Sequence, residues 1–91
     1  MEYILLPYSE EKLKFMQKHL VDLRYAAVWS AEKLGYLIGV TRQTINNYES
    51  GRAIIKKPVY IALAAIFDYE CMSNTFLRAR LKILLEEEGL R

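Results

Sequence analysis

The segment LGYLIGVTRQTI, residues 34–45, decides the fold of this chain. Apolar residues repeat at helical spacing up to Gly39, and Thr41 opens a second helical pattern only two residues later. Two short helices must therefore meet at a steep angle across a very short turn. Gly35 lets them approach, and Gly39 permits the left-handed backbone conformation that such a corner requires. The apolar residues expected to clamp the corner are Leu34, Val40 and Ile45.

The second of these helices, residues 41–50, carries polar side chains on its outer face. They are Arg42, Gln43, Thr44, Asn46 and Asn47. An Arg side chain can pair with guanine O6 and N7, and Gln or Asn with adenine N6 and N7, each through two hydrogen bonds. A merely solvated face would more typically carry Glu and Lys. The pattern favours a helix that contacts the edges of DNA bases.

Helical periodicity continues through the rest of the chain and predicts an all-α fold. We expect one compact domain, residues 1–91, made of five helices and an N-terminal extension. The predicted helices are residues 10–27 with Ser9 as N-cap, 31–38 with Ser30, 42–50 with Thr41, 58–68 opened by Pro58, and 73–88. The fourth is apolar on nearly every side and should be central to the core. Strand signals are weak, and only residues 3–6 could add a short edge.

Composition argues against several other classes of protein. No stretch reaches the roughly 18 consecutive apolar residues of a membrane helix, and the first eight residues lack the basic leader of a signal peptide. Cys71 is the single cysteine, which fits a reducing, cytoplasmic compartment, and we interpret it as a small buried hydrophobe. The single histidine, His19, lies far from it in sequence. We therefore expect no metal site, no cofactor and no enzyme activity.

The formal net charge is only +2, but its distribution is uneven. Residues 41–57 carry four basic side chains, Arg42, Arg52, Lys56 and Lys57, against the single acid Glu49. This local positive excess coincides with the polar helix and the loop that follows it. It is the charge distribution expected where a protein meets a polyanion.

Residues 20–67 resemble the phage-repressor and Cro-like (XRE-type) helix-turn-helix family, a five-helix DNA-binding domain of the lambda-repressor-like type. The resemblance begins at Leu23-Arg24 and spans the helix-turn-helix motif, residues 30–51, without a gap. It is carried by SAEKLG (30–35), IGVTRQTI (38–45) and YESGR (48–52). The family implies a cytoplasmic transcriptional regulator that docks its third helix in the major groove of double-stranded DNA. It also implies that a homodimer binds a two-fold related site.

The resemblance assigns roles to individual positions. Arg42, Gln43 and Asn47 occupy base-facing places, while Thr41, Thr44 and Asn46 would meet phosphates or neighbouring bases. Arg52, Lys56 and Lys57 fall where the family's loop touches the DNA backbone, and Arg24 and Glu49 where it forms a partly buried ion pair. The chain departs from the family at Ala31, where Gln is frequent, and at Gly35, where alanine is usual. It also departs at Tyr36-Leu37, which we expect the N-terminal extension to cover.

The predicted fifth helix carries two apolar stripes, although docking on one core requires only one. Leu77, Leu81, Leu84 and Leu85 form one stripe, and Phe76, Ala79 and Ile83 form the other. We predict a dimer surface drawn from Phe76, Leu77, Leu81, Ile83, Leu84 and Leu85, unless the N-terminal extension covers the spare stripe. The main alternative function is a protein-interaction module, such as an antitoxin or antirepressor, that binds a partner protein through this helix.

Overall fold

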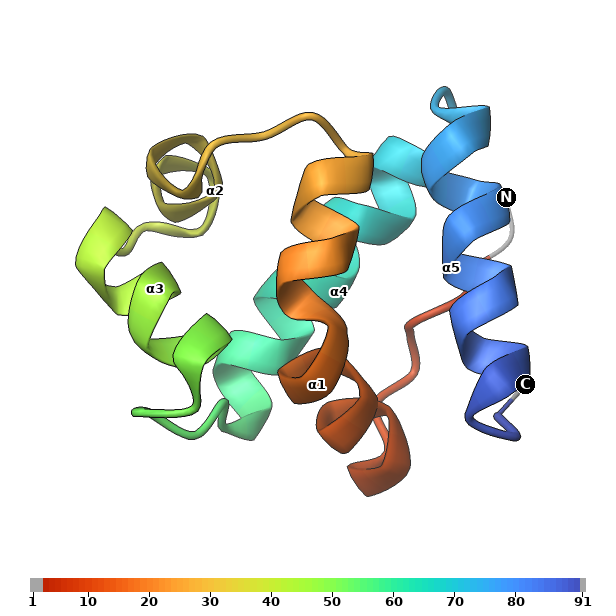
Figure 1. Cartoon of the computed structure of the whole chain (residues 1–91), viewed down its shortest axis with the longest axis horizontal. Helices are drawn as coiled ribbons and strands as arrows, with labels where there is room; N and C mark the ends of the chain where they lie inside the picture. The colour runs from red at the N-terminus through yellow and green to blue at the C-terminus, as the bar shows by residue number, and fades with distance from the viewer. Residues whose placement is uncertain (1–2, 91) are drawn as a thin grey trace.

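The computed structural model describes residues 3–90, and five α-helices follow one another along this part of the chain (Figure 1). They are α1 (Glu10–Ala26), α2 (Ala31–Ile38), α3 (Arg42–Ser50), α4 (Lys57–Cys71) and α5 (Thr75–Glu87). No strand occurs within these described residues, and no helix among them is long and apolar enough to cross a membrane. The predicted all-α, five-helix architecture is confirmed.

The helix starts are set by side-chain caps, most of which the sequence predicted. The hydroxyls of Ser9, Ser30 and Thr41 accept hydrogen bonds from the backbone N–H three residues ahead and so satisfy one of the unpaired donors at each N-terminus. Asn74 does the same for α5, which therefore begins at Thr75 and not near Ser73. The predicted caps of the first three helices are confirmed.

Two other helix ends differ from the sequence-based prediction. Helix α1 ends at Ala26, one residue earlier than expected, with Ala27 as its C-cap. Helix α4 begins one residue before Pro58 and continues three residues past Asp68 to Cys71. No glycine or proline follows Asp68 to end the helix, and the buried side chain of Cys71 packs into the core. Burial also raises the pKa of the Cys71 thiol to about 11.

The core lies where α1 and α4 pass between a pair of helices at one end and a single helix at the other (Figure 1). Helices α2 and α3 pack together at the first end, and α5 lies against α1 and α4 at the second. Trp29, in the link between α1 and α2, stacks on Phe67 of α4 with ring centroids 5.4 Å apart. The fully buried side chains include Leu20, Leu23, Leu34, Ile45, Tyr60, Leu63 and Phe67.

Helix α4 is central to the core, as predicted, but one side of it faces solvent. Its inner side is buried, but Ile61, Ala65, Tyr69 and Met72 are exposed. These residues recur at helical spacing and form an uncharged outer stripe. The apolar composition of a helix shows that it has an inner face but does not show how much of the helix is covered.

Four residues of the predicted dimer surface are instead the core side of α5. Leu77, Leu81, Leu84 and Leu85 are at most 3% exposed, because this stripe packs α5 against α1 and α4. The prediction was wrong for these four leucines. Phe76 and Ile83 are 67% and 46% exposed and form the spare stripe.

The N-terminal extension packs along α4. Leu5 is fully buried, and the carboxylate of Asp68, 1% exposed, accepts hydrogen bonds from the backbone N–H groups of Ile4, Leu5 and Leu6 at 2.9–3.1 Å. The hydroxyl of Tyr60 donates to the carbonyl of Leu5 at 2.7 Å. Burial, with the nearby Asp68 charge, raises the pKa of Tyr60. The backbone polar groups of an extended segment are thereby satisfied without a sheet.

This placement leaves uncovered the surface that the extension was expected to cover, and also the spare stripe of α5, for which the extension was the alternative to a dimer partner. Tyr36 of α2 is 80% exposed, so the expectation that the extension covers Tyr36-Leu37 was wrong. The spare stripe of α5 is also open at Phe76. The sequence shows that residues 3–8 are apolar but not which groove they enter.

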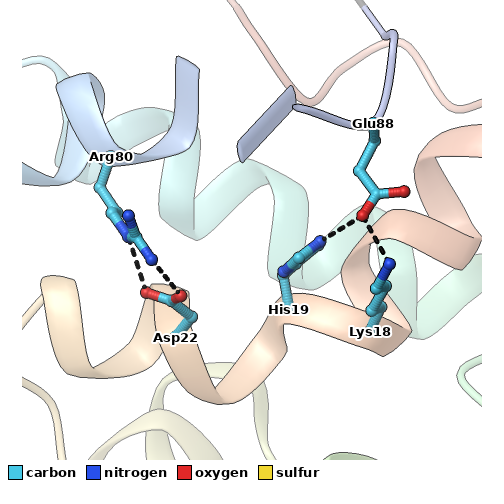
Figure 2. A network of polar contacts seen from close by, with 5 residues as sticks. All are labelled: Lys18, His19, Asp22, Arg80 and Glu88. Atoms are coloured by element: carbon cyan, nitrogen blue, oxygen red, sulfur yellow. Dashed lines mark hydrogen bonds and ion pairs between the residues drawn. The ribbon is translucent and has the colours of Figure 1, made fainter. Parts of the chain in front are cut away.

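Polar contacts at the solvent edge fix α5 against α1 (Figure 2). Arg80 pairs with Asp22 through two hydrogen bonds of 2.8 and 3.1 Å, and this pairing lowers the pKa of Asp22. At the C-terminal end of α5, the C-cap residue Glu88 accepts from Lys18 at 2.7 Å and lies 3.0 Å from His19 Nε2. Hydrogen bonds from Lys18 and His19 lower the pKa of Glu88. Polar contacts therefore pair both halves of α5 with α1.

The corner between α2 and α3 is closed by a backbone contact at Gly35. This residue is buried, and a Cβ atom added to it would lie 2.6 Å from the carbonyl oxygen of Val40. The N–H of Val40 bonds to the carbonyl of Gly35 at 2.8 Å, and Gly39 adopts the left-handed conformation with φ 83°. The departure from the alanine usual in the family therefore has a physical reason in this chain.

We predict that Gly35→Ala destabilises the domain. Alanine gains about 1 kcal/mol of helix propensity, but its methyl group meets backbone that cannot rotate away, an overpacking cost of about 1–3 kcal/mol or more. The expected net loss is about 1–2 kcal/mol in the free energy of unfolding, measured by urea titration. Gly39→Ala is the matched control, since space is open there and only the left-handed strain of about 1–2 kcal/mol applies. A Gly35→Ala protein more stable than the parent contradicts the close contact.

Candidate nucleic-acid interface

Helix α3 is held to the domain along one side. Ile45 is fully buried beneath it, and Tyr48 is half-buried. The glycine corner fixes one end of the helix, and Gly51, with φ 81°, ends it at the other. Because the inner side of this short helix is fixed, its opposite side is presented to solvent.

A nearly buried ion pair sets the rotation of α3 relative to α1. Arg24 donates from Nε and Nη2 to the two carboxylate oxygens of Glu49 at 2.5 and 3.2 Å, and from Nη1 to the carbonyl of Trp29 at 3.0 Å. The two side chains are 10% and 11% exposed. The hydrogen bond to Glu49 raises the pKa of Arg24. The paired geometry and the deep burial indicate a structural role.

The outer face of α3 carries the predicted base-contacting residues, with different degrees of exposure. Arg42, Gln43 and Asn46 are exposed, and Asn47 is half-buried at the edge. Gln43 Nε2 donates to Asn47 Oδ1 at 3.2 Å, which links two amides one turn apart. This bond does not use the carbonyl oxygen of Gln43 or the amide nitrogen of Asn47, so both atoms keep their capacity to bond to a ligand.

Thr41 and Thr44 serve the start of α3. The Thr41 hydroxyl caps the helix by accepting from the Thr44 N–H at 3.1 Å, and the two hydroxyl oxygens are 3.0 Å apart. Thr41 is exposed and Thr44 half-buried. These residues therefore have an observed structural function, and any contact to a phosphate would be additional.

The loop after α3 and the start of α4 carry the remaining predicted basic residues. Arg52, Lys56 and Lys57 are exposed, and Lys57 opens α4. The loop is tied to α3, because the N–H of Ala53 donates to the carbonyl of Asn47 at 3.1 Å. The predicted basic positions are therefore exposed in the segment that directly follows α3.

Gln17 of α1 holds this loop in place, which the sequence did not indicate. Its Nε2 donates to the carbonyls of Tyr48 and Ala53 at 2.6 and 3.3 Å, and its Oε1 accepts from the N–H of Ile55 at 2.7 Å. Carbonyls only accept and N–H groups only donate, so these three partners fix the orientation of the amide. A lone Gln on a helix gives no sequence signal for such a clamp.

The electrostatic character of this surface is positive. Within residues 3–90, Arg42, Arg52 and Lys56 form no ion pair, and the acid in the same region, Glu49, is neutralised by Arg24. The outer face of α3 and the loop after it therefore form a convex surface of amides, one exposed guanidinium on the helix and several cations beside it. Amide and guanidinium groups match base edges, and the cations match phosphates.

The fold and this surface define a helix-turn-helix protein. A family model described as Helix-turn-helix matches residues 26–71, just over half of the chain, and the chain belongs to this family, of the XRE type. No curated protein and no solved structure matched the chain significantly. Membership makes the protein a DNA-binding transcription regulator in general terms. The matched range includes α2, α3 and α4 and only the last residue of α1, and it leaves out the N-terminal extension and α5.

We predict that Glu49→Ala costs about 3–5 kcal/mol in the free energy of unfolding, because it leaves the Arg24 guanidinium buried without its counter-charge. Urea titration followed by Trp29 fluorescence measures this loss. Replacing both residues by apolar ones, Arg24→Met with Glu49→Leu, should cost much less, since no charge then remains buried. A loss below about 1 kcal/mol for Glu49→Ala would mean that water reaches the guanidinium, as at an exposed pair.

Proposed function

We propose that this protein binds double-stranded DNA sequence-specifically by placing α3 in the major groove. The observation that carries the proposal is the outer face of α3, where Arg42, Gln43 and Asn46 are exposed on a helix whose other side is fixed. The major groove, about 12 Å wide, admits an α-helix. On entry, the exposed side chains of Arg52, Lys56 and Lys57 would meet the sugar–phosphate backbone.

The proposal divides the work between base contacts and phosphate contacts. Arg42, Gln43 and Asn47 would contact bases, with the Gln43–Asn47 hydrogen bond holding both amides in one orientation. The remaining Gln43 carbonyl and amide hydrogen match adenine N6 and N7. Thr41, Thr44 and Asn46 would lie near phosphates or flanking bases. Arg52, Lys56 and Lys57 would supply affinity that does not depend on sequence.

Gln43→Ala and Lys56→Ala should therefore weaken binding in different ways. Loss of the Gln43 amide should cost about 1–3 kcal/mol at the preferred sequence and relax the preference at one base pair. Loss of Lys56 should weaken binding to all duplexes alike and reduce the slope of log K against log salt by about 1. Fluorescence anisotropy across salt concentrations, on selected and scrambled duplexes, separates the two. Indistinguishable behaviour of the two variants contradicts the division.

Selection of bound duplexes from a random library identifies the operator, the DNA sequence that the protein prefers. A sequence-specific protein enriches a common motif, whereas a protein that binds DNA only through charge does not. A palindromic motif would also support a two-fold dimer on the site.

We further propose a homodimer formed through the spare stripe of α5. Phe76 and Ile83 lie on the solvent side of this helix, and Phe76 is one turn from Arg80, which pairs with Asp22 of α1. Val21 and Tyr25 of α1, which flank the Arg80 partner Asp22 in sequence, are also exposed, at 38% and 68%. Exposed apolar side chains that gather in one patch mark a protein–protein interface. A two-fold dimer would set two copies of α3 about 34 Å apart.

Phe76→Glu should shift the protein from dimer to monomer without unfolding it. Burying a carboxylate at the centre of an apolar interface should cost about 2 kcal/mol or more of association free energy. Sedimentation equilibrium measures the shift. Tyr69→Glu, on the uncharged outer stripe of α4, is the matched control and should leave the dimer intact. The opposite pattern, with Tyr69→Glu producing monomers, would place the interface on α4.

The alternative function, a protein-interaction module such as an antitoxin, would use the same exposed stripe of α5 for a different protein. This alternative is supported if the protein is monomeric and does not bind duplex DNA at physiological salt. In that case Phe76→Glu should abolish binding of the protein partner. Substitution of Leu81 is unsuitable for this test, because Leu81 is buried in the core.

A further inference from the structure

The N-terminal extension reaches the basic end of the proposed DNA-binding surface. Residues 3–8, here called the N-terminal strap, are fixed to α4 at one end by Asp68 and Tyr60. At the other end the strap finishes at Tyr8, just before the Ser9 cap of α1. The strap lies outside the range matched by the family model.

Tyr8 lies between a buried ring and an exposed cation. Its ring meets the ring of Tyr60 edge-on, with centroids 5.7 Å apart, and Tyr60 is fully buried. The ammonium nitrogen of Lys57 lies 4.9 Å from the centroid of the Tyr8 ring. This distance is within the range of a cation–π contact. The buried Tyr60 therefore supports a half-buried ring on which the Lys57 side chain rests.

We propose that Tyr8 is a positioning residue for DNA binding: it holds the Lys57 ammonium in place for a phosphate. The inference rests on the proposed function and names a residue of the strap that acts through Lys57 without contacting DNA itself. A lysine side chain has several rotatable bonds, and fixing it on contact with a phosphate costs conformational entropy. The ring restricts the side chain before binding and leaves the ammonium exposed for an anion.

Lys56 provides an internal comparison. It is exposed and adjacent in sequence, but within residues 3–90 no aromatic ring lies against its ammonium. If Tyr8 acts by positioning Lys57, substitution of Tyr8 should no longer change DNA affinity once Lys57 is replaced, but should still change it once Lys56 is replaced. If substitution of Tyr8 instead loosens the whole strap, the change in affinity should be the same in both backgrounds.

The test is a double-mutant cycle on duplex affinity at low salt. Tyr8→Leu keeps an apolar contact with Tyr60 but removes the aromatic face, and it should weaken binding about two- to fivefold, the size of an exposed cation–π contact. In the Lys57→Ala background Tyr8→Leu should have no further effect, while in the Lys56→Ala background the full factor should remain. Tyr8→Phe keeps the aromatic face and should bind like the parent.

Two further measurements separate positioning from stability. Urea titration of each variant checks that the domain stays folded. The proton shifts of the Lys57 side chain, which a ring beneath the ammonium moves upfield, should return to ordinary values in Tyr8→Leu and stay displaced in Tyr8→Phe. If Tyr8→Leu unfolds the domain, Tyr8→Met in the same cycle provides the comparison.

The inference is overturned if Tyr8→Leu weakens duplex binding by the same factor in the Lys57→Ala and Lys56→Ala backgrounds. Tighter binding by Tyr8→Leu also overturns it, because the ring would then hold Lys57 away from DNA. Either result leaves the proposed function intact, provided that the parent protein binds duplex with the expected salt dependence. A parent that does not bind duplex at any salt concentration removes the proposed function and this inference together.

Discussion

The close approach of Gly35 to the backbone of Val40 is the constraint on which the functional surface depends. It allows α2 and α3 to be joined by a very short turn, because Gly35 has no side chain to fill the space between α2 and the backbone of Val40 and Thr41. Once the corner is closed, Ile45 and the Arg24–Glu49 pair leave α3 one rotation about its axis. The outward position of Arg42 and Gln43 is a consequence of these inner contacts.

Local chemistry made much of this fold predictable from the sequence. The caps Ser9, Ser30 and Thr41 act on backbone within three residues, and Gly39 and Gly51 act on their own dihedral angles, so their effect can be judged in isolation. The contact between Arg24 and Glu49 has no local signal and followed only from the family resemblance. The helix ends and the corner between α2 and α3 were therefore predictable from local chemistry, whereas the Arg24–Glu49 ion pair was predictable only from the family resemblance.

The predictions that were wrong concern which surfaces meet. Both stripes of α5 are apolar, and the sequence did not show that the leucine stripe that includes Leu81 would be buried while Phe76 stays exposed. The same holds for α4, where apolar residues lie on the buried and the exposed sides alike. Asp68 is a buried charged residue in a helix rich in apolar residues, and only the fold shows that backbone N–H groups of the extension satisfy it.

The family match covers the middle of the chain, and the segments at both ends lie outside it. Residues 26–71 provide the DNA-binding unit of a transcription regulator. The N-terminal strap and α5 both pack on α4 or its neighbours, and each brings an exposed feature to a different place. Tyr8 contacts Lys57 at the start of α4. Phe76 belongs to α5, which lies at the opposite end of the molecule from α3 (Figure 1). We propose that the first tunes contact with DNA and the second assembles the dimer.

NMR titration of the labelled protein with duplex DNA shows whether α3 and the loop after it form the DNA-binding surface. We expect amide shift changes concentrated in residues 41–57, including the side-chain amides of Gln43 and Asn47. Changes centred on the outer stripe of α4 or on α5, with Arg42 and Gln43 unaffected, would contradict this expectation.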